Sequence, residues 1–512
     1  VERLRIVSSS GYVGIGTTSP GVALEVIGSI SGSASSTGSF GKLRINKLDS
    51  NEILSTDGSS GIKLQSSGVL NAYQGIVLPT TKILYFDGGD NTFIRESAAD
   101  TVQIYTGGAA RLILDTNSKI SLSNNDSGTS NTLFGKSIGA PDAGSNYNVM
   151  IGEGAMGGAT LDDSTENVAV GYRAGYNITT SDKNVLIGMQ AGQLMTTGNQ
   201  NTYVGWDSGR YQVGGSNNTA VGMGAGKYQR GSNNVMMGVS AQFGESSSPY
   251  TNGSNNTAIG TSALANTRAS QSYTTALGSE AGYATTGSYN TFVGGKAGYG
   301  GTTSAPYSSG ASNTGTQNVV IGPNSGDAIT TGGTNTIVGY QAGSTMTTTA
   351  KTTLVGFQSG YLINSADADG TTAVGYNSAR DLTEGQYNTV LGHEAGTNLT
   401  TGDSNTAIGY EAMHGNDSTA LTGNQNTSVG YNSLGALTDG DSNVVIGQNA
   451  GDAMAVGESQ NIAIGQSSMG AFDEGTAGGD IDGNIAIGNS AFVGGDLAGN
   501  DRQVQDNVAI GR

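Results

Sequence analysis

The stretch Asn405-Thr-Ala-Ile-Gly409-Tyr-Glu-Ala412 is one copy of the phrase that decides the fold of this 512-residue chain. The phrase consists of Asn, two small or apolar residues, an aliphatic residue, Gly, two variable residues, and then Ala or Ser. It recurs about 21 times between Asn131 and Gly511, and nine of the twenty intervals between its glycines equal the one from Gly205 to Gly222. No interval is shorter than the one from Gly222 to Gly238, and the longest runs from Gly294 to Gly322. A minimum spacing that is nearly constant, with extra residues in some intervals, predicts the stacked coils of a solenoid with insertions in its loops.

Each copy is predicted to be a β-strand, because it is rich in Val, Ile and Thr and is bounded by Gly and Asn. A period of about 17 residues is also too short for the paired helices of a helical repeat. The glycine never varies between copies, which fits a backbone position with positive φ or one packed too closely for a Cβ. Three positions later a small residue recurs in all complete copies but the first, where Ile138 stands. A small residue suits the narrow corner of a thin coil.

Asparagine opens 18 of the 21 copies, and Thr274, Thr352 and Thr371 replace it in the others. An asparagine at a turn can hydrogen-bond its own backbone and the equivalent residue of the next coil, and it tolerates the left-handed conformation. We therefore interpret these asparagines as structural rather than as ligands of a metal or a substrate.

Several copies are apolar at consecutive strand positions, as in Asn443-Val-Val-Ile446 and Asn318-Val-Val-Ile321. A strand with one solvent-exposed face should instead alternate between apolar and polar residues. One face of each strand should therefore fill the coil, and the other should pack on something else. The simplest partner for that second face is another copy of the same chain.

Composition limits the function classes. The chain has 85 glycines, and only 12% of its residues are charged and 6% aromatic, yet its aliphatic residues are periodic, so it is neither disordered nor an ordinary globular domain. A net charge of −18 disfavours nucleic-acid binding, which needs clustered Lys and Arg. There is no cysteine for a disulfide or a thiolate metal site, and no apolar run that predicts membrane insertion. Because the chain starts at Val1 and stops just past a repeat glycine, we expect a segment of a longer or processed product.

Residues 1–128 lack the phrase and form the first predicted domain, and the solenoid occupies residues 129–512. Short alternating segments separated by polar turns predict a meandering antiparallel β-structure in the first domain. These segments are 3–6, 23–26, 42–45, 82–86, 102–105, 111–114 and 119–122. The low-complexity stretch 31–41 is predicted to be a flexible joint.

Two parts of the sequence resemble known fibrous proteins. Glu2-Arg-Leu-Arg-Ile6, Tyr12-Val-Gly-Ile-Gly-Thr-Thr-Ser-Pro20 and Leu24-Glu-Val26 together resemble a segment common in phage tail fibres. The repeated phrase, which spans the chain from Asn131 to Gly511, is similar to the head repeats of trimeric autotransporter adhesins and to fibre repeats of phages. The adhesin pattern is usually shorter per turn, and neither a heptad stalk nor a membrane anchor is visible, so the resemblance favours the phage fibre. In such fibres a C-terminal chaperone is often cleaved away after trimerisation, which would fit an end at Arg512, as would plain truncation.

The resemblance implies an all-β homotrimeric fibre with a β-rich N-terminal region and a long parallel β-solenoid. The predicted function is a structural and receptor-binding segment of a phage or phage-like tail fibre, in the virion or the extracellular space, that attaches to a host surface by multivalency. Predicted partners are the chain itself, a cell-surface glycan or another host receptor, and other fibre or baseplate proteins. Two alternatives stay open: the head of a bacterial trimeric surface adhesin, and a tailspike glycan depolymerase.

Carboxylates gather in the loops between copies, at Asp162, Asp163, Asp367, Asp369, Asp480 and Asp482. An acid and a base could cleave a glycan, but solvated aspartate is also the ordinary residue of turns. The stretches 367–370 and 480–484 resemble fragments of calcium loops without the full EF-hand pattern, so calcium binding stays open. The two histidines, His393 and His414, have no serine in a nucleophile-elbow pattern to work with. We predict no enzymatic activity, and we assign no catalytic residue, cofactor or metal ligand.

Six successive copies, from Gly339 to Gly430, place an aromatic residue or histidine directly after the glycine. They are Tyr340, Phe357, Tyr376, His393, Tyr410 and Tyr431. Equivalent positions of stacked coils lie about 4.8 Å apart, so these side chains are predicted to form a ladder along one face of the chain. Two interpretations stay open: a structural ladder that covers the coil, and a stripe of aromatic faces on which sugars stack.

Overall fold

The computed structural model describes residues 4–15, 17–19, 24–26, 83–85, 91–98, 101–114, 120–121, 130–244, 252–266, 271–300, 313–416, 418–470, 481–494 and 504–511. Over these ranges the structure is all-β, as predicted, apart from one 3-10 turn at Ala366–Ala368. None of the described elements is a helix that could span a membrane. The chain divides into two compact units, Val1–Leu78 and Pro79–Arg512.

The first unit contains a three-stranded sheet of β1 (Arg5–Val7), β2 (Tyr12–Ile15) and β3 (Leu24–Val26). β2 was not among the predicted strands, and it pairs antiparallel with β1 but parallel with β3, so the prediction of a purely antiparallel meander is wrong here. Alternation of apolar and polar residues indicates a strand but not the direction in which it pairs. The predicted strand 42–45 and the predicted joint 31–41 lie outside the described residues.

The second unit begins with a five-stranded antiparallel sheet, which confirms the meander predicted between residues 82 and 122. Its strands are β4 (Ile83–Tyr85), β5 (Phe93–Ala98), β6 (Thr101–Thr106), β7 (Ala109–Leu114) and β8 (Ile120–Ser121). β5 was not predicted, because the charged Arg95 and Glu96 interrupt its apolar pattern. Arg95 is accommodated by a cross-strand partner, since its guanidinium donates a hydrogen bond to the Tyr105 hydroxyl at 2.6 Å.

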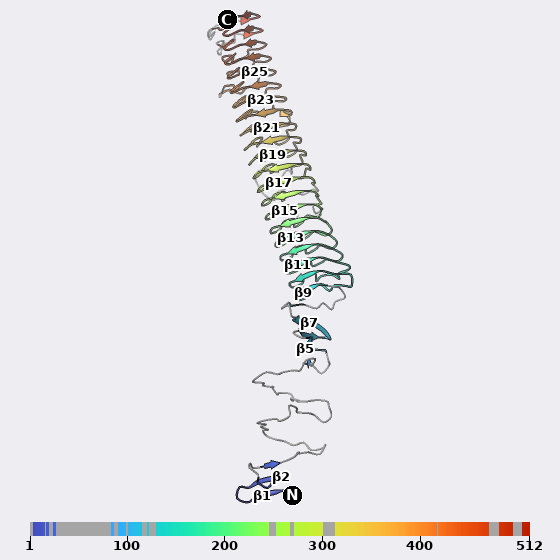
Figure 1. The fold of residues 1–512 in the computed structure, drawn as a ribbon. Helices are drawn as coiled ribbons and strands as arrows, with labels where there is room; N and C mark the ends of the chain where they lie inside the picture. The colour runs from blue at the N-terminus through green and yellow to red at the C-terminus, as the bar shows by residue number, and fades with distance from the viewer. Residues whose placement is uncertain are drawn as a thin grey trace. The chain divides into compact units, whose positions relative to one another are not determined.

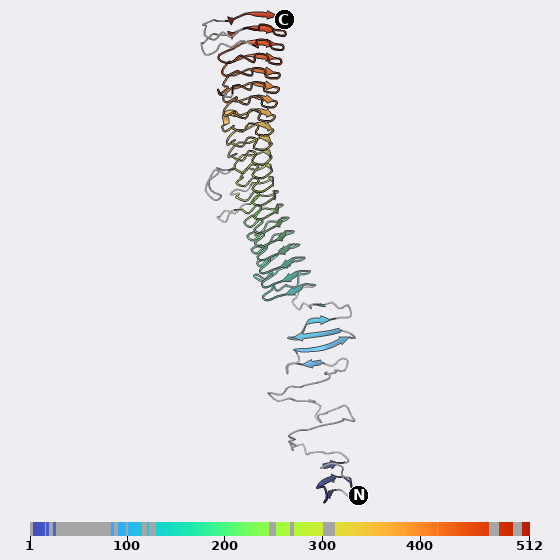
Figure 2. The same cartoon turned by 90° about the vertical axis from the view of Figure 1, so that its left-hand side faces the viewer.

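The repeated phrase forms the predicted parallel β-solenoid, and its strands stack like rungs in both views (Figure 1, Figure 2). Twenty-one strands make up this sheet. The order is linear, because among the described strands the first and the last each pair with a single neighbour. At about 4.8 Å per coil the stack of coils is about 100 Å long.

The solenoid strands are β9 (Thr132–Phe134), β10 (Val149–Ile151), β11 (Val168–Val170), β12 (Val185–Ile187), β13 (Thr202–Val204), β14 (Thr219–Val221), β15 (Val235–Met237), β16 (Thr257–Ile259), β17 (Thr275–Leu277), β18 (Thr291–Val293), β19 (Val319–Ile321), β20 (Thr336–Val338), β21 (Thr353–Val355), β22 (Thr372–Val374), β23 (Thr389–Leu391), β24 (Thr406–Ile408), β25 (Thr427–Val429), β26 (Val444–Ile446), β27 (Ile462–Ile464), β29 (Ile485–Ile487) and β31 (Val508–Ile510). β28 (Ile481–Asp482) and β30 (Val504–Gln505) form a separate parallel pair.

The central residue of each strand points into the coil, and the two residues beside it lie on the outer face. Ala169, Leu186 and Tyr203 occupy one register column and are fully or almost fully buried. In β26, by contrast, Val445 is fully buried whereas Ile446, beside it, is 39% exposed. The prediction that one strand face fills the coil is confirmed, and the other face is apolar and uncovered in the single chain.

The repeat glycines have both a positive φ and no room for a Cβ, the two reasons given for their invariance. Gly222 has a φ of 135°, and a Cβ built on it would lie 2.5 Å from the carbonyl oxygen of Gly238 in the next coil. Gly409 has a φ of 136° and faces the carbonyl of Gly430 in the same way. A side chain at this position would therefore strain its own backbone and also push the next coil away.

The repeat asparagines form a buried ladder along the solenoid. The backbone N–H and the side-chain Nδ2 of Asn184 both donate to Asn167 Oδ1 of the preceding coil, at 3.0 and 2.9 Å. Asn184 Nδ2 also donates to the carbonyl of Gly198, at 3.0 Å. The structural interpretation of the asparagines is supported, but the left-handed residue is the one before each asparagine, such as Lys183 with a φ of 59°.

Replacing Asn405 with Ala is expected to destabilise the solenoid by about 1–3 kcal/mol for each buried group left without a partner. Asn405 accepts from the backbone N–H of Asn426 at 2.9 Å and donates to the carbonyl of Gly423 at 2.8 Å. Asn405→Thr should cost less, because Thr371, at the equivalent position, donates to the corresponding carbonyl of Gly385 at 3.2 Å. Thermal unfolding of both variants checks this, and equal melting of Asn405→Ala and the parent protein would contradict it.

Candidate interaction surface

Six rings stack in one column on the surface of the solenoid, and we call them the aromatic row. They are Tyr340, Phe357, Tyr376, His393, Tyr410 and Tyr431, each directly after a repeat glycine, and each is exposed in the single chain. Successive ring centroids are 5.5, 5.0, 4.9, 5.2 and 5.2 Å apart, and successive planes are inclined by 5–16°. The sequence prediction of the ladder therefore matches the geometry of these six residues.

This stacking changes what the aromatic row can offer a ligand. Because the rings lie nearly parallel at about the spacing of the coils, their faces are covered by one another. Sugars that stack on the faces of single rings do not fit this arrangement, so that form of the sugar-binding interpretation is corrected. The aromatic row instead presents ring edges and the phenol hydroxyls of its four tyrosines.

A second column, which we call the polar row, follows the aromatic row one position later along the chain. Its members are amides or carboxylates: Gln341, Gln358, Asn377, Glu394, Glu411 and Asn432. The first two are linked, since Gln358 Nε2 donates to Gln341 Oε1 at 2.9 Å. Sequence reasoning missed this column because its residue types differ from coil to coil, although the run of planar polar side chains is visible once the copies are aligned.

The two rows are within reach of each other. The Nδ1 atom of His393 lies 3.7 Å from Glu394 Oε2. A hydrogen bond between the Tyr410 phenol and the Glu411 carboxylate, together with the negative charge of Glu411, raises the pKa of Tyr410. A carboxylate thus lies beside an imidazole in one coil and beside a phenol in the next.

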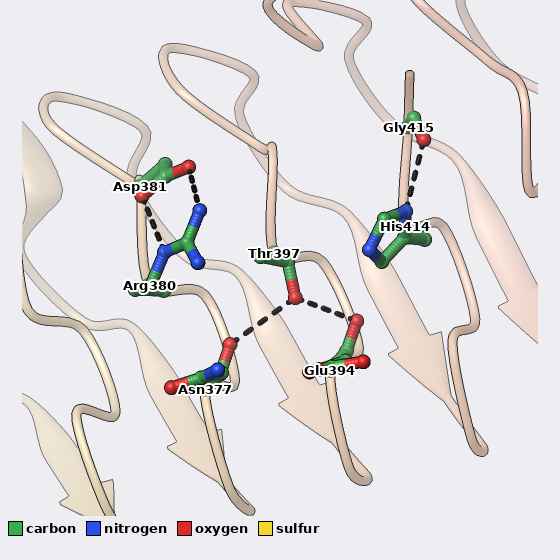
Figure 3. Close-up of polar contacts among 7 residues, drawn as sticks. All are labelled: Asn377, Arg380, Asp381, Glu394, Thr397, His414 and Gly415. Atoms are coloured by element: carbon green, nitrogen blue, oxygen red, sulfur yellow. Dashed lines mark hydrogen bonds and ion pairs between the residues drawn. The ribbon is translucent and has the colours of Figure 1, made fainter. Parts of the chain in front are cut away.

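Turn contacts fix the backbone that carries the polar row. Figure 3 shows the Thr397 hydroxyl donating to the backbone carbonyls of Asn377 and Glu394, at 3.3 and 2.8 Å. Asn377 itself is 7% exposed, and within the described part of the chain its Oδ1 has no hydrogen-bond partner.

Two further polar contacts lie on the same coils. Arg380 and Asp381 form an ion pair with two hydrogen bonds of 2.8 and 2.7 Å, and His414 Nδ1 lies 3.0 Å from the carbonyl oxygen of Gly415 (Figure 3). His414 is thus engaged with its own turn, whereas His393 stacks between Tyr376 and Tyr410.

The outer face of the sheet adds a large uncharged surface beside the aromatic row. We define the uncharged face as the first and third residues of each strand from β11 to β27 and of β29, that is, from Val168 to Ile487. None of these residues is Asp, Glu, Lys or Arg. Its third strand position carries half-exposed aliphatic or methionine side chains, for example Ile187 at 39%, Met237 at 41% and Leu391 at 47%.

A second apolar run occupies the position after the glycine nearer the start of the solenoid. It consists of the exposed residues Tyr172, Met189, Trp206, Met223 and Val239. The sequence pattern did not reveal this run, because its members mix aromatic, methionine and aliphatic side chains.

The loop carboxylates differ in the groups that they contact. Asp162 and Asp163 lie with Asp142, with one oxygen of each within 4.8 Å of the others, a cluster that could hold a cation. Hydrogen bonds from the side chain and backbone of Ser145 lower the pKa of Asp142. The predicted aspartates of this cluster thus sit beside a third acid that sequence reasoning did not single out.

Two of the other predicted aspartates hydrogen-bond to the backbone of another coil. Asp369 Oδ1 accepts from the backbone N–H of Ala350 at 2.6 Å, and Asp482 Oδ1 accepts from that of Ser459 at 2.7 Å. Both carboxylates therefore tie one coil to another. Asp367 lies in the 3-10 turn Ala366–Ala368, where its backbone N–H donates to the Ser365 hydroxyl at 3.0 Å, and Asp480 lies outside the described residues.

Comparisons with known protein families, with curated proteins and with solved structures found no match for this chain.

Proposed function

We propose that this chain is a structural and receptor-binding segment of a phage or phage-like tail fibre, which assembles as a homotrimer and attaches to a host surface. The observation that carries the proposal is the uncharged face, which continues over 18 successive coils of a chain with a net charge of −18. Soluble monomers rarely expose contiguous apolar patches larger than a few hundred Å². The resemblance of the repeated phrase and of the N-terminal segments to fibre proteins supports the same assignment.

The uncharged face is suited to other copies of the chain because its period is the period of the solenoid. A parallel copy would present the same Val, Ile and Thr side chains at the same spacing, coil after coil, so complementarity repeats along the whole length. Closed symmetry would cover the face in every chain at once. The anionic loops, which lie between the repeated phrases, would then remain in water.

The adhesin-head alternative shares this assembly and differs in what the fibre is anchored to. For the depolymerase alternative, the backbone hydrogen bonds of Asp369 and Asp482 instead support a structural role for those carboxylates. The fibre proposal therefore remains the one best supported by the surfaces described.

Light scattering on the purified chain tests the assembly. We expect a particle of about three times the 51.4 kDa chain mass. Attachment is tested by binding of the fluorescently labelled protein to a panel of bacterial cells, where we expect retention on some strains and not others. A monomer mass in dilute buffer would contradict the trimer, and retention on no strain would contradict the receptor-binding part.

A further inference from the structure

We propose that the aromatic row and the polar row together form a track for a neutral, extended, β-linked polysaccharide that lies parallel to the solenoid axis, one sugar per coil. The inference rests on the proposed receptor-binding function and names the ligand class and its orientation. In this arrangement the sugars hydrogen-bond along the edges of the rings instead of stacking on their faces.

The period of the surface is the first argument. The aromatic row repeats at 4.9–5.5 Å over six coils. An extended β-linked hexose chain advances by a comparable distance per sugar, so one sugar can lie at each coil, and every second sugar presents the same edge to the track. A helical α-linked chain curves away from a straight track and cannot keep this register.

The chemistry of the two rows is the second argument. Phenol hydroxyls donate and accept, amides do both, and carboxylates accept, which are the groups that hold sugar hydroxyls in place. The contact between His393 and Glu394 and the hydrogen bond between Tyr410 and Glu411 place the two kinds of group side by side. No other run of six coils combines an aromatic ring or histidine with an amide or carboxylate at these two positions.

Charge selects the class of polysaccharide. Glu394 and Glu411 occupy successive coils in the centre of the track, and the whole chain is strongly anionic. A polyuronate or sulfated glycan would meet like charge at these two residues, so the track favours a neutral chain.

The test uses the full chain and cello-oligosaccharides of increasing length, with malto-oligosaccharides as the helical control, measured by calorimetry. We expect affinity to rise with cello-oligosaccharide length and to level off at about six sugars, because many weak sites share the load. Affinity that does not depend on length, or equal affinity for both series, would overturn the track.

Removing only the hydroxyls separates binding from stability. The triple variant Tyr376→Phe, Tyr410→Phe and Tyr431→Phe keeps the stacked rings, so its melting should match the parent while its affinity falls about tenfold or more. Tyr273 and Tyr289 provide the control, since they are also exposed and stacked, at 5.2 Å, but lie outside the track. The double variant Tyr273→Phe and Tyr289→Phe should bind as the parent does.

The outcomes distinguish this inference from the proposed function. If the triple Phe variant keeps full affinity, the track is wrong. If labelled protein is retained on cells but no cello-oligosaccharide binds, the track is wrong and the receptor-binding proposal stands. If oligosaccharides bind the track but the protein is retained on no cells, the proposed function fails instead.

Discussion

Replacing Gly409 with Val is expected to lower the stability of the solenoid more than any other single change in the repeated phrase. The residue has a φ of 136°, a region that a β-branched residue avoids, at a cost of about 1–3 kcal/mol. The new Cβ would also meet the backbone carbonyl of Gly430, which cannot move without shifting the next coil. In an assembled fibre the same damage occurs once in each chain, so the unfolding temperature should fall well below that of the parent protein.

Gly457 provides a control that separates strain from crowding. Its φ is 79°, yet a Cβ built on it would have no atom within 4 Å. Gly457→Val should therefore cost only the backbone strain, and it should melt between Gly409→Val and the parent protein. If the two variants melted together, the close contact between successive coils would not be the reason for the invariant glycine.

The glycine and asparagine columns could be predicted because one residue type meets the same backbone requirement in every coil. The inward strand position was also predictable, although it holds residues as different as Ala169 and Tyr203, because the alternation of faces is a property of the strand. Tyr203 is an extreme case, since its burial inside the coil raises its pKa far above the ordinary value.

The filling of the coil interior beyond the strand could not be predicted from a single copy. In one coil Leu399, in the turn well after the glycine, is fully buried, whereas in the next coil both Met413, closer to its glycine, and Leu421, in the later turn, are fully buried. The positions of the large buried side chains thus differ from coil to coil, so no single position carries a pattern. The polar row was not predicted for a related reason. Gln, Asn and Glu are chemically similar planar polar side chains, but a motif defined by one residue type does not detect them.

Two features could not be predicted because they depend on tertiary placement: the unsatisfied Oδ1 of Asn377 and the direction of β3. Whether a side-chain oxygen finds a donor, or a strand pairs in parallel, depends on neighbours that are distant in sequence. The resemblance to fibre proteins predicted the architecture of the solenoid well, but it did not locate the surfaces on which a ligand or another chain would bind.

Replacing Leu391 with Glu is expected to break the assembly. The side chain is 47% exposed in the single chain and points away from the coil interior, so the substitution should leave an isolated solenoid folded. In a homotrimer closed over the uncharged face, the same substitution would place three carboxylates at one level of an apolar interface. Burying unpaired charge costs several kcal/mol, so light scattering should show monomers and the unfolding temperature should fall.

Thr401→Glu is the matched control, because Thr401 is an exposed turn residue off the uncharged face and gains the same charge. It should remain trimeric and melt as the parent protein does. If Leu391→Glu were also trimeric with unchanged melting, the third strand position would face water in the assembled protein, and the uncharged face would have to be covered along another of its columns or not at all. Because the two variants carry equal charge, a difference between them reports on where the charge lies rather than on the net charge of the fibre.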